Sequence, residues 1–321
     1  MKKYGCLLVA LGTPASPEPS DIRDFLRAFL SDPAVVDFPR WLWNPILHQI
    51  ILRVRPEKIA PTYASIWQAA GSPLEVYTKA QCAQLVKALP EVEVKFAMTY
   101  TKPSIAQAVQ EFAAEGTDEI VLIPLCPHYV PSTVADIYRQ TAQLNAVGNL
   151  PKISIVPQWP TQTEYIAWYR QQLCEAIAEH RPERIIFSYH GVPQRKAHAP
   201  NSYQQQCLAT TKAIMAEMPE CAYEVTFQSK FGPGKWLQPA TIDRMAQLPN
   251  QGARRILLLT PGFLADCIET LDELDVLNQA AFTQAGGEHF ARVAPLNADT
   301  SAGNILAQIF HRQIAGSGES Q

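Results

Sequence analysis

Short apolar runs without polar alternation recur along the chain, and segments with helical spacing separate them. An apolar run of about four to eight residues is typical of a strand buried on both faces of a sheet. Between the runs, apolar residues recur every three or four positions, as in a helix that packs through one face. This pattern predicts strands at 5–11, 92–98, 119–125, 153–156, 184–189, 223–227 and 255–260. It predicts helices that begin near Ser20 and Ser104 and after Thr133, and others at 163–179, 203–218, 268–282 and 300–312.

Strands that alternate with helices indicate an α/β fold whose parallel sheets are covered by helices on both faces. A faint duplication supports two such units, because Leu11-Gly-Thr-Pro14 and His190-Gly-Val-Pro193 each end a strand with the same spacing. We therefore expect two similar Rossmann-like lobes with a ligand cleft between them.

The boundary between the two lobes is expected near 145–155. The N-terminal lobe would cover 1–150 and include an apolar lip at 38–55. The C-terminal lobe would cover 151–321 and carry the two residues with the clearest chemistry, His190 and Glu269.

The composition and charge of the chain argue against several classes of protein. Of 321 residues, 47% are hydrophobic, which allows a full core, and the net charge is −3 without a long basic run. A nucleic-acid partner is therefore not expected. Seven scattered cysteines without a CxxC pair are typical of a reduced, cytoplasmic protein. No stretch reaches the ~20 apolar residues of a membrane span, and residues 1–12 fit a buried strand better than a signal peptide.

Two strand ends carry candidate catalytic groups. The run 184–189 leads directly into His190, Gly191 and a proline, which would hold an imidazole at the carboxyl edge of a sheet. A second strand, 255–260, is followed by a segment that contains Glu269. On spacing alone, His190 fits a hydrogen-bonded core histidine as well as a functional one, and the acids near Glu269 also fit a solvated helix face.

Several motifs in order resemble the ferrochelatase family over nearly the whole chain. They are Leu11-Gly-Thr-Pro14, Gly71-Ser-Pro-Leu74, the region of Pro127-His-Tyr129, Ser188-Tyr-His-Gly-Val-Pro193, Thr226-Phe-Gln-Ser-Lys-Phe-Gly-Pro233, and Pro261-Gly-Phe-Leu-Ala-Asp-Cys-Ile-Glu-Thr-Leu-Asp-Glu273. The resemblance implies two Rossmann-like lobes and an enzyme that inserts Fe²⁺ into a porphyrin to form haem. Iron is then a substrate, and no prosthetic group is expected. No cysteine follows Cys267, so we expect no iron–sulfur cluster held by a C-terminal tail.

The resemblance also implies roles for the two strand ends. His190 matches the histidine that removes pyrrole protons and binds the metal, a task that suits an imidazole with an ordinary pKa of about 6.5. Glu269 matches the second catalytic and metal-binding group. Asp272 and Glu273 follow on the same predicted helix, where a row of carboxylates could pass protons or metal ions.

Further residues match the porphyrin-binding wall of the family. Leu11 stands where protoporphyrin-using members carry an apolar residue, so protoporphyrin IX is the expected substrate and coproporphyrin III the alternative. The other matching positions are Thr13, Pro14, Tyr100, Tyr129, Ser132 and Thr133, with Arg53 and Arg55 as partners for porphyrin propionates. The chain departs from the family pattern at Thr99, Cys126 and Val130, and His128 is interpreted as structural.

The segment 38–52 is the most apolar candidate for an exposed surface. From Trp43 onward, Ile46, Leu47, Ile50 and Ile51 would share one helical face. In the family this region forms an apolar lip, which could admit porphyrin or contact a membrane surface transiently. A helix packed into the core explains the same pattern. We expect a monomer.

Two other functions fit the same residues. A chelatase that inserts cobalt or nickel into another tetrapyrrole would use similar ligands, because imidazole and carboxylate do not select Fe²⁺ strongly. A porphyrin or haem carrier without catalysis is the alternative from a different class. A carrier has no need of a proton acceptor, so the pairing of His190 with Glu269 favours an enzyme.

Overall fold

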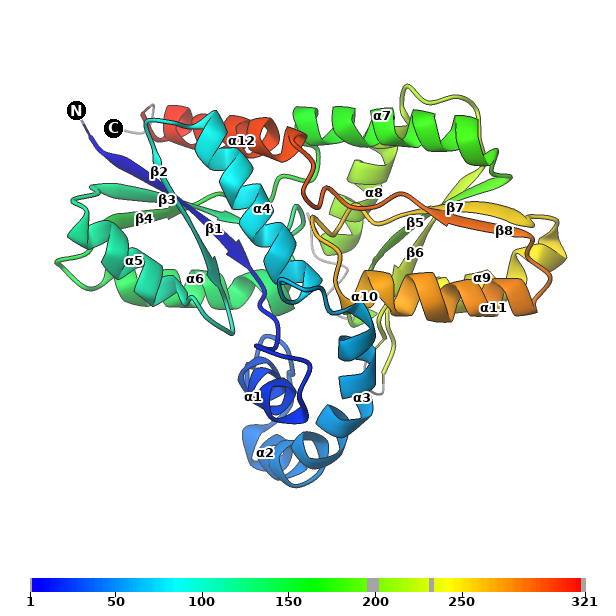
Figure 1. Ribbon diagram of the computed structural model, residues 1–321, viewed down its shortest axis with the longest axis horizontal. Coiled ribbons are helices and arrows are strands. Elements are labelled where there is room, and N and C mark those ends of the chain that lie inside the picture. The colour runs from blue at the N-terminus through cyan, green and yellow to red at the C-terminus, as the bar shows by residue number, and fades with distance from the viewer. Residues whose placement is uncertain (1, 195–201, 231–233, 319–321) are drawn as a thin grey trace. The chain divides into compact units, whose positions relative to one another are not determined.

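The chain folds into two units, each built on one parallel sheet (Figure 1). This computed structural model describes residues 2–194, 202–230 and 234–318. Unit 1 comprises 1–126, 130–157 and 297–321, and unit 2 comprises 127–129 and 158–296. The C-terminal residues thus belong to unit 1, whereas the sequence pattern placed all of 151–321 in one lobe. Residues 231–233 of the ferrochelatase-like motif lie outside the described residues.

Unit 1 contains a sheet with strand order β2-β1-β3-β4, in which every pairing is parallel. Its strands are β1 (Tyr4–Ala10), β2 (Glu93–Met98), β3 (Glu119–Pro124) and β4 (Lys152–Ile155). Its helices are α1 (Pro19–Leu30), α2 (Arg40–Ile46), α3 (Leu52–Ile66), α4 (Pro73–Ala88), α5 (Ile105–Ala114), α6 (Pro131–Asn145) and α12 (Ser301–Gly318), with a π-helix at Leu47–Ile51.

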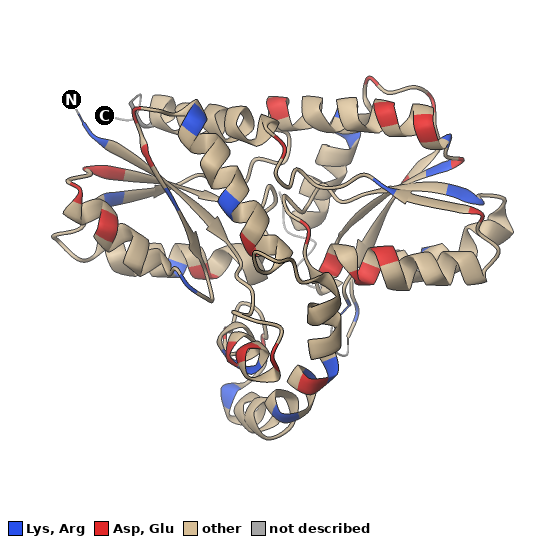
Figure 2. Cartoon of the chain, viewed as in Figure 1, with Lys and Arg blue, Asp and Glu red and all other residues tan. Residues whose placement is uncertain are grey.

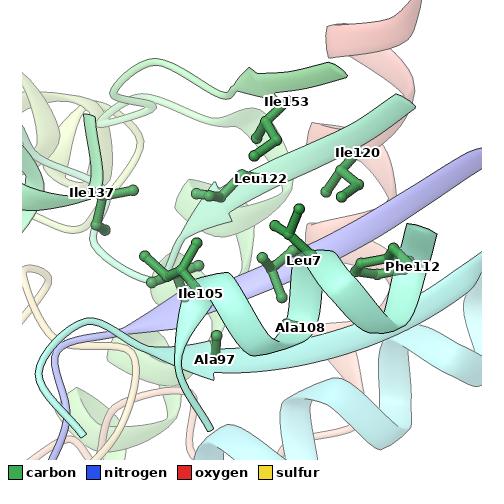
Figure 3. Close-up of a cluster of buried hydrophobic side chains, with 11 residues drawn as sticks. Leu7, Ala97, Ile105, Ala108, Phe112, Ile120, Leu122, Ile137 and Ile153 are labelled. Carbon is green, nitrogen blue, oxygen red and sulfur yellow. The ribbon is translucent and has the colours of Figure 1, made fainter. Parts of the chain in front are cut away.

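The core of unit 1 explains why its strands are apolar runs. Leu7 of β1 and Leu122 of β3 are fully buried under Ile105 and Phe112 of α5, while Ile137 of α6 closes the same cluster (Figure 3). Contacts of α4 with β2 and of α12 with β3 cover the other face of the sheet (Figure 1). A strand between two helical layers has no solvent face, so it shows no alternation.

Unit 2 repeats this topology with strand order β6-β5-β7-β8, again parallel throughout. Its strands are β5 (Arg184–His190), β6 (Tyr223–Gln228), β7 (Arg255–Leu259) and β8 (His289–Arg292). Its helices are α7 (Thr163–His180), α8 (Tyr203–Met215), α9 (Thr241–Gln247), α10 (Ile268–Leu271) and α11 (Gln279–Gln284), with a 3₁₀-helix at Pro249–Gln251 and a π-helix at Glu273–Asn278. The matching strand orders confirm the two Rossmann-like lobes expected from the sequence.

Each predicted strand exists, with boundaries that differ by one residue or a few. Some of the predicted helix features are wrong. Ser20 does not cap α1, which begins at Pro19 after Glu18. The single helix expected at 268–282 is instead α10, a π-helix and α11. The strand β8 was missed because its sequence, His-Phe-Ala-Arg, is short and only half-buried at the sheet edge.

The apolar segment near residue 40 does not present one continuous face. Trp43 and Leu47 are buried, and the Trp43 indole Nε1 donates to the Leu30 carbonyl at 2.8 Å. Trp41 and Ile50 are instead exposed, at 76% and 58%. The π-helix at Leu47–Ile51 adds a residue to the turn and rotates the faces of α2 and α3 relative to a regular helix. The common face predicted for Trp43, Ile46, Leu47, Ile50 and Ile51 is therefore wrong.

Charged residues of both signs are interspersed over the elements of both units (Figure 2). This distribution agrees with the small net charge of −3. Within the described ranges, no helix combines the length and apolar character needed to cross a bilayer.

Replacement of Gly303 tests why α12 belongs to unit 1. A Cβ at Gly303 would lie 2.6 Å from the carbonyl oxygen of Gln84 in α4, so α12 packs there only because the side chain is absent. We expect Gly303→Ala to lower the free energy of unfolding by about 1–3 kcal/mol through overpacking. Urea denaturation measures this change. Gly316→Ala in the same helix is the control, because no atom lies within 4 Å of its added Cβ. Equal stability of the two variants would contradict the packing account.

Candidate active site

The carboxyl edge of the unit 2 sheet brings together the acids and the imidazole that the sequence singled out. After β5 the chain forms β6 on one side of that strand and then returns to form β7 on the other side. The carboxyl ends of β5 and β7 thus flank the point where the strand order reverses, which is the usual ligand position in open α/β sheets. His190 ends β5, and the segment with Glu269 follows β7.

His190 is held in one tautomer by the turn that follows it. Its Nδ1 lies 2.7 Å from the backbone carbonyl oxygen of Gly191. A carbonyl only accepts hydrogen bonds, so Nδ1 carries the proton, and in the neutral ring Nε2 keeps its lone pair. The turn needs glycine at 191, because a Cβ there would lie 2.6 Å from the Gln228 carbonyl oxygen. The half-buried imidazole therefore offers Nε2 as a proton acceptor or metal ligand.

Gln228 connects the end of β5 to the start of α10. Its backbone carbonyl accepts from the Gly191 N–H at 2.7 Å, directly beside His190 in the strand register. Its side-chain Oε1 accepts from Ser188 Oγ at 2.7 Å, and its Nε2 donates to the Glu269 carbonyl at 2.7 Å. The side-chain amide thus links Ser188 of β5 to the backbone of Glu269, while the backbone carbonyl of Gln228 holds the turn after His190.

The turn before Glu269 is braced by a buried ion pair. Arg292 of β8 contacts Asp266 at 3.0 Å and also donates from Nε to Asp275 at 2.7 Å. Asp266 in turn accepts a hydrogen bond from Thr270 Oγ1 at 2.7 Å. Both Arg292 and Asp266 are almost fully buried, so the segment between β7 and α10 is tied firmly to the sheet.

Glu269 lies next to the thiol of Cys267. Burial raises the pKa of the Cys267 thiol well above its ordinary value, and the Glu269 carboxylate raises it further. Glu269 itself is half-buried at the first turn of α10. Cys267 therefore stays a neutral thiol beside the acid rather than acting as a thiolate.

Glu273 is held by Ser229, the residue that follows β6. The Ser229 N–H donates to Glu273 Oε1 at 2.6 Å, and the Ser229 hydroxyl donates to Oε2. Burial raises the Glu273 pKa, these hydrogen bonds and His190 lower it in part, and nearby Glu269 raises it. Ser229 adopts φ 61°, a left-handed conformation that costs a serine about 1 kcal/mol or more and that often marks functional sites.

Glu269 raises the pKa of Glu273 and His190 lowers it, so both groups lie within electrostatic range of Glu273. Asp272, one residue earlier, is also half-buried, and burial raises its pKa. Glu269 lies in α10, Glu273 begins the π-helix, and Asp272 lies between these two elements. Across the described ranges, no group of three or more His, Cys, Asp or Glu side chains is preformed as a metal cage. His190 Nε2 and Glu269 are therefore candidate metal ligands, and the acids are candidate proton carriers.

His128 and Tyr129 belong to unit 2 although their neighbours in sequence belong to unit 1. His128 Nε2 lies 2.8 Å from Thr210 Oγ1, and burial lowers the His128 pKa to about 3. This residue is a neutral, packed histidine, in agreement with its structural interpretation. The Tyr129 N–H donates to Gln206 Oε1 at 2.7 Å, and its side chain is 37% exposed.

In unit 1, four of the residues predicted to contact porphyrin lie at the carboxyl ends of β1 and β2. Leu11 follows β1 and is half-buried, while its carbonyl accepts from the Tyr100 N–H at 3.1 Å. Thr13 and Pro14 are buried in the loop that follows. Leu11, Thr13, Pro14 and Tyr100 are therefore neighbours along one sheet edge.

The family pattern places an arginine directly before Tyr100, where this chain has Thr99. A different arginine, Arg139, nevertheless lies near Tyr100. The Tyr100 hydroxyl donates to Asp32 at 2.7 Å, and Arg139 of α6 donates to the same carboxylate at 3.2 Å. Both carboxylate oxygens of Asp32 are thus used within this network. The Tyr100 hydroxyl is engaged by Asp32, and its ring packs in a T-shaped contact with Phe29 at 5.3 Å between centroids.

The remaining predicted residues of unit 1 occupy helices. Ser132 and Thr133 lie in the first turn of α6, directly after the loop that follows β3. Arg53 of α3 is exposed and donates to Gln49 Oε1 at 2.6 Å, and Arg55 is half-buried. The structure places these residues on two different helices of unit 1.

Sequence reasoning missed Gln228, Ser229 and Arg292 as supports of the site. Gln228 and Ser229 stand in the motif that carries the family resemblance, so their position after a predicted strand was a usable signal. Arg292 had no such signal, because it belongs to the short strand that the apolar pattern does not mark.

Replacement of Glu273 tests its raised pKa. A carboxyl with a raised pKa in the folded protein stabilises the fold while protonated, and this contribution is lost as pH rises through that pKa. We expect the stability of Glu273→Gln relative to the unchanged protein to increase as pH rises above 4.5, the ordinary value, and then to level off. Urea midpoints between pH 4 and pH 8 measure it. Glu91→Gln, at an exposed acid, controls for loss of one charge, and a pH-independent difference for Glu273→Gln would contradict the assignment.

Solved structures with the same architecture include chelatases. SirB from Bacillus subtilis with Fe³⁺ superposes with a TM-score of 0.60 at 11% identity and covers 99% of this chain and 98% of its own. CbiX, the terminal enzyme of sirohaem biosynthesis in denitrifying bacteria, superposes with a TM-score of 0.55 at 15% identity, covering 96% and 98%. At these identities the likeness supports the fold alone.

Other relatives have a much higher sequence identity to this chain than these two structures have. A coproporphyrin III ferrochelatase from Lactococcus lactis subsp. lactis (strain IL1403) is 41% identical over 311 residues, which is 96% of this chain and 98% of the relative. A ferrochelatase from Pectobacterium atrosepticum is 40% identical over 312 residues, with 96% and 98% covered. The ferrochelatase family profile matches residues 3–314. The chain thus belongs to the ferrochelatase family and is a metal chelatase.

Proposed function

We propose that this chain inserts Fe²⁺ into protoporphyrin IX, with release of the two pyrrole N–H protons. The observation that carries the proposal is the set of three groups at one sheet edge: His190 with its Nε2 lone pair, Glu269, and Glu273, whose pKa burial raises. Metal insertion into a free-base porphyrin needs a proton acceptor and a metal ligand at the same place, and these groups supply both.

His190 would take the first proton. Its Nδ1 donates to the Gly191 carbonyl, so only Nε2 can accept a proton from a pyrrole N–H or bind the incoming metal. A neutral imidazole is a suitable general base, because its unprotonated nitrogen can accept a proton. Each porphyrin N–H that breaks leaves an electron pair on nitrogen, and that pair forms the new bond to iron.

The carboxylates would take the second proton and guide the cation. Glu269 is the candidate metal ligand beside His190, and oxygen with imidazole donors is compatible with Fe²⁺. Glu273 has a raised pKa, so it can hold a proton nearer neutral pH than an exposed glutamate can. Asp272 continues the acidic row toward solvent and offers a path for protons or metal ions.

The choice of porphyrin rests on Leu11. Protoporphyrin IX carries two propionates and two vinyl groups, whereas coproporphyrin III carries four propionates. An apolar, half-buried Leu11 at the end of β1 suits a vinyl-bearing edge better than a charged one. The second candidate is coproporphyrin III, because several relatives at 40–41% identity are named for that substrate.

Anaerobic metalation assays test the proposal directly. Purified protein is mixed with Fe²⁺ and either protoporphyrin IX or coproporphyrin III, and the change in porphyrin absorbance is followed. We expect a higher kcat/KM for protoporphyrin IX than for coproporphyrin III. Reversed preference would assign coproporphyrin III, and rates no faster than in free solution with Fe²⁺, Co²⁺ or Ni²⁺ would reject catalysis.

Removal of the imidazole should separate chemistry from binding. We expect His190→Ala to lower kcat by about 10²-fold or more, since general base catalysis contributes roughly 10²–10⁴-fold. Porphyrin affinity, measured by quenching of porphyrin fluorescence, should change little. His311→Ala, at an exposed histidine of α12, is the control. A His190→Ala variant that keeps its turnover would show that another group accepts the proton.

Replacement of Gln228 tests its role as a positioning residue. Gln228→Met keeps the length of the side chain but loses the bonds to Ser188 and the Glu269 carbonyl. We expect kcat to fall roughly tenfold to a hundredfold because the reacting groups lose alignment, while KM for porphyrin stays similar. Gln247→Met on the exposed face of α9 is the control. Loss of stability with unchanged kcat would leave Gln228 only a structural role.

A further inference from the structure

Two histidines face each other at the edge of the unit 2 sheet opposite to the candidate active site. His180 ends α7, and His289 begins β8 beside Arg255, the first residue of β7. His190 stands at the other end of its strand, and six residues of extended chain separate these edges by about 20 Å. The histidine pair is therefore a separate feature, which the proposed porphyrin chemistry does not use.

The pair meets through ring nitrogens. His180 Nδ1 and His289 Nε2 are 3.2 Å apart, whereas the ring centroids are 5.2 Å apart with planes inclined by 37°. Zinc–imidazole bonds are about 2.0–2.1 Å long, so a metal ion bound to both nitrogens at this separation would subtend an angle of about 100–105°. This angle is close to tetrahedral. The metal ion would replace the proton of the hydrogen bond that now joins the two nitrogens, and that proton would be released to solvent.

The backbone on both sides of the pair is fixed. Arg255 donates from Nη2 to the His180 carbonyl and from Nε to the Arg181 carbonyl at 3.3 Å, which ties the end of α7 to β7. The His289 N–H donates to the Arg254 carbonyl at 3.0 Å within the sheet. Because both ligands lie on rigid elements, they lose less conformational entropy when they bind an ion.

The surroundings have opposing electrostatic effects. The guanidinium of Arg255, a residue that pairs with His289 in the sheet, disfavours a cation at this place. The Glu179 carboxylate lies 4.0 Å from His180 Nε2, on the side of the ring away from His289. A carboxylate on the far nitrogen of a metal-bound histidine strengthens that ligand.

We propose that His180 and His289 form a second metal site, which binds a divalent late transition-metal ion such as Zn²⁺, Ni²⁺ or Cu²⁺. Imidazole nitrogen suits these ions. The described residues contain no cluster of three or more His, Cys, Asp or Glu at any place, so water completes the coordination. Both side chains are half-buried, which leaves room for those waters.

Binding assays in a His190→Ala background test this site without interference from the candidate active site. Calorimetric titration with Zn²⁺ and Ni²⁺ is compared for His190→Ala alone and combined with His180→Gln, His289→Gln or His311→Gln. We expect at least tenfold weaker binding when either His180 or His289 is replaced. His311→Gln, at an exposed histidine elsewhere, should bind as the background does.

Two further measurements test the proposal even if one variant folds poorly. Zn²⁺ should raise the melting temperature of the background protein by about 2–4 °C, and this shift should vanish in whichever of the two histidine variants folds. Electron paramagnetic resonance of bound Cu²⁺ should show two equivalent nitrogen ligands. Unchanged affinity in the His180→Gln or His289→Gln variant, or a Cu²⁺ spectrum without two nitrogen ligands, would overturn the proposal.

Discussion

The hydrogen bonds of one buried amide, Gln228, determine the geometry on which the proposed chemistry depends. Gln228 is the last residue of β6. Its side chain joins the strand that carries His190 to the segment that carries Glu269. A buried amide that lost these partners would cost about 1–3 kcal/mol, so its bonds define a single arrangement rather than one of several. Parallel strands bring the two segments to one edge, and Gln228 fixes their register at that edge.

The groups of the site differ in charge state because their surroundings differ. Burial and nearby Glu269 raise the pKa of Glu273, while Ser229 holds its carboxylate through two hydrogen bonds. Cys267 is kept as a thiol, and His190 is kept in the tautomer with Nε2 free. In the proposed reaction, His190 would accept a proton, Glu269 would bind the metal ion and Glu273 would hold a proton.

Much of this arrangement could be predicted from the sequence. Buried strands such as β3 are unbroken apolar runs, and the parallel order they imply places His190 and Glu269 at one edge. The π-helix after α10 could not be predicted, because its pattern matches an ordinary helix and Ser229 holds Glu273 through contacts distant in sequence. Likewise, the burial of Trp43 depends on the Leu30 carbonyl, which no local periodicity reveals.

The central claim is that His190 and Glu269 act as one unit on the same porphyrin. A double-mutant cycle tests it most directly, with kcat for iron insertion measured in His190→Ala, Glu269→Gln and the double variant. Groups that serve one step together lose their contribution together. The account predicts that the double variant is about as slow as the slower single variant. Losses that multiply, as for independent sites, would contradict it.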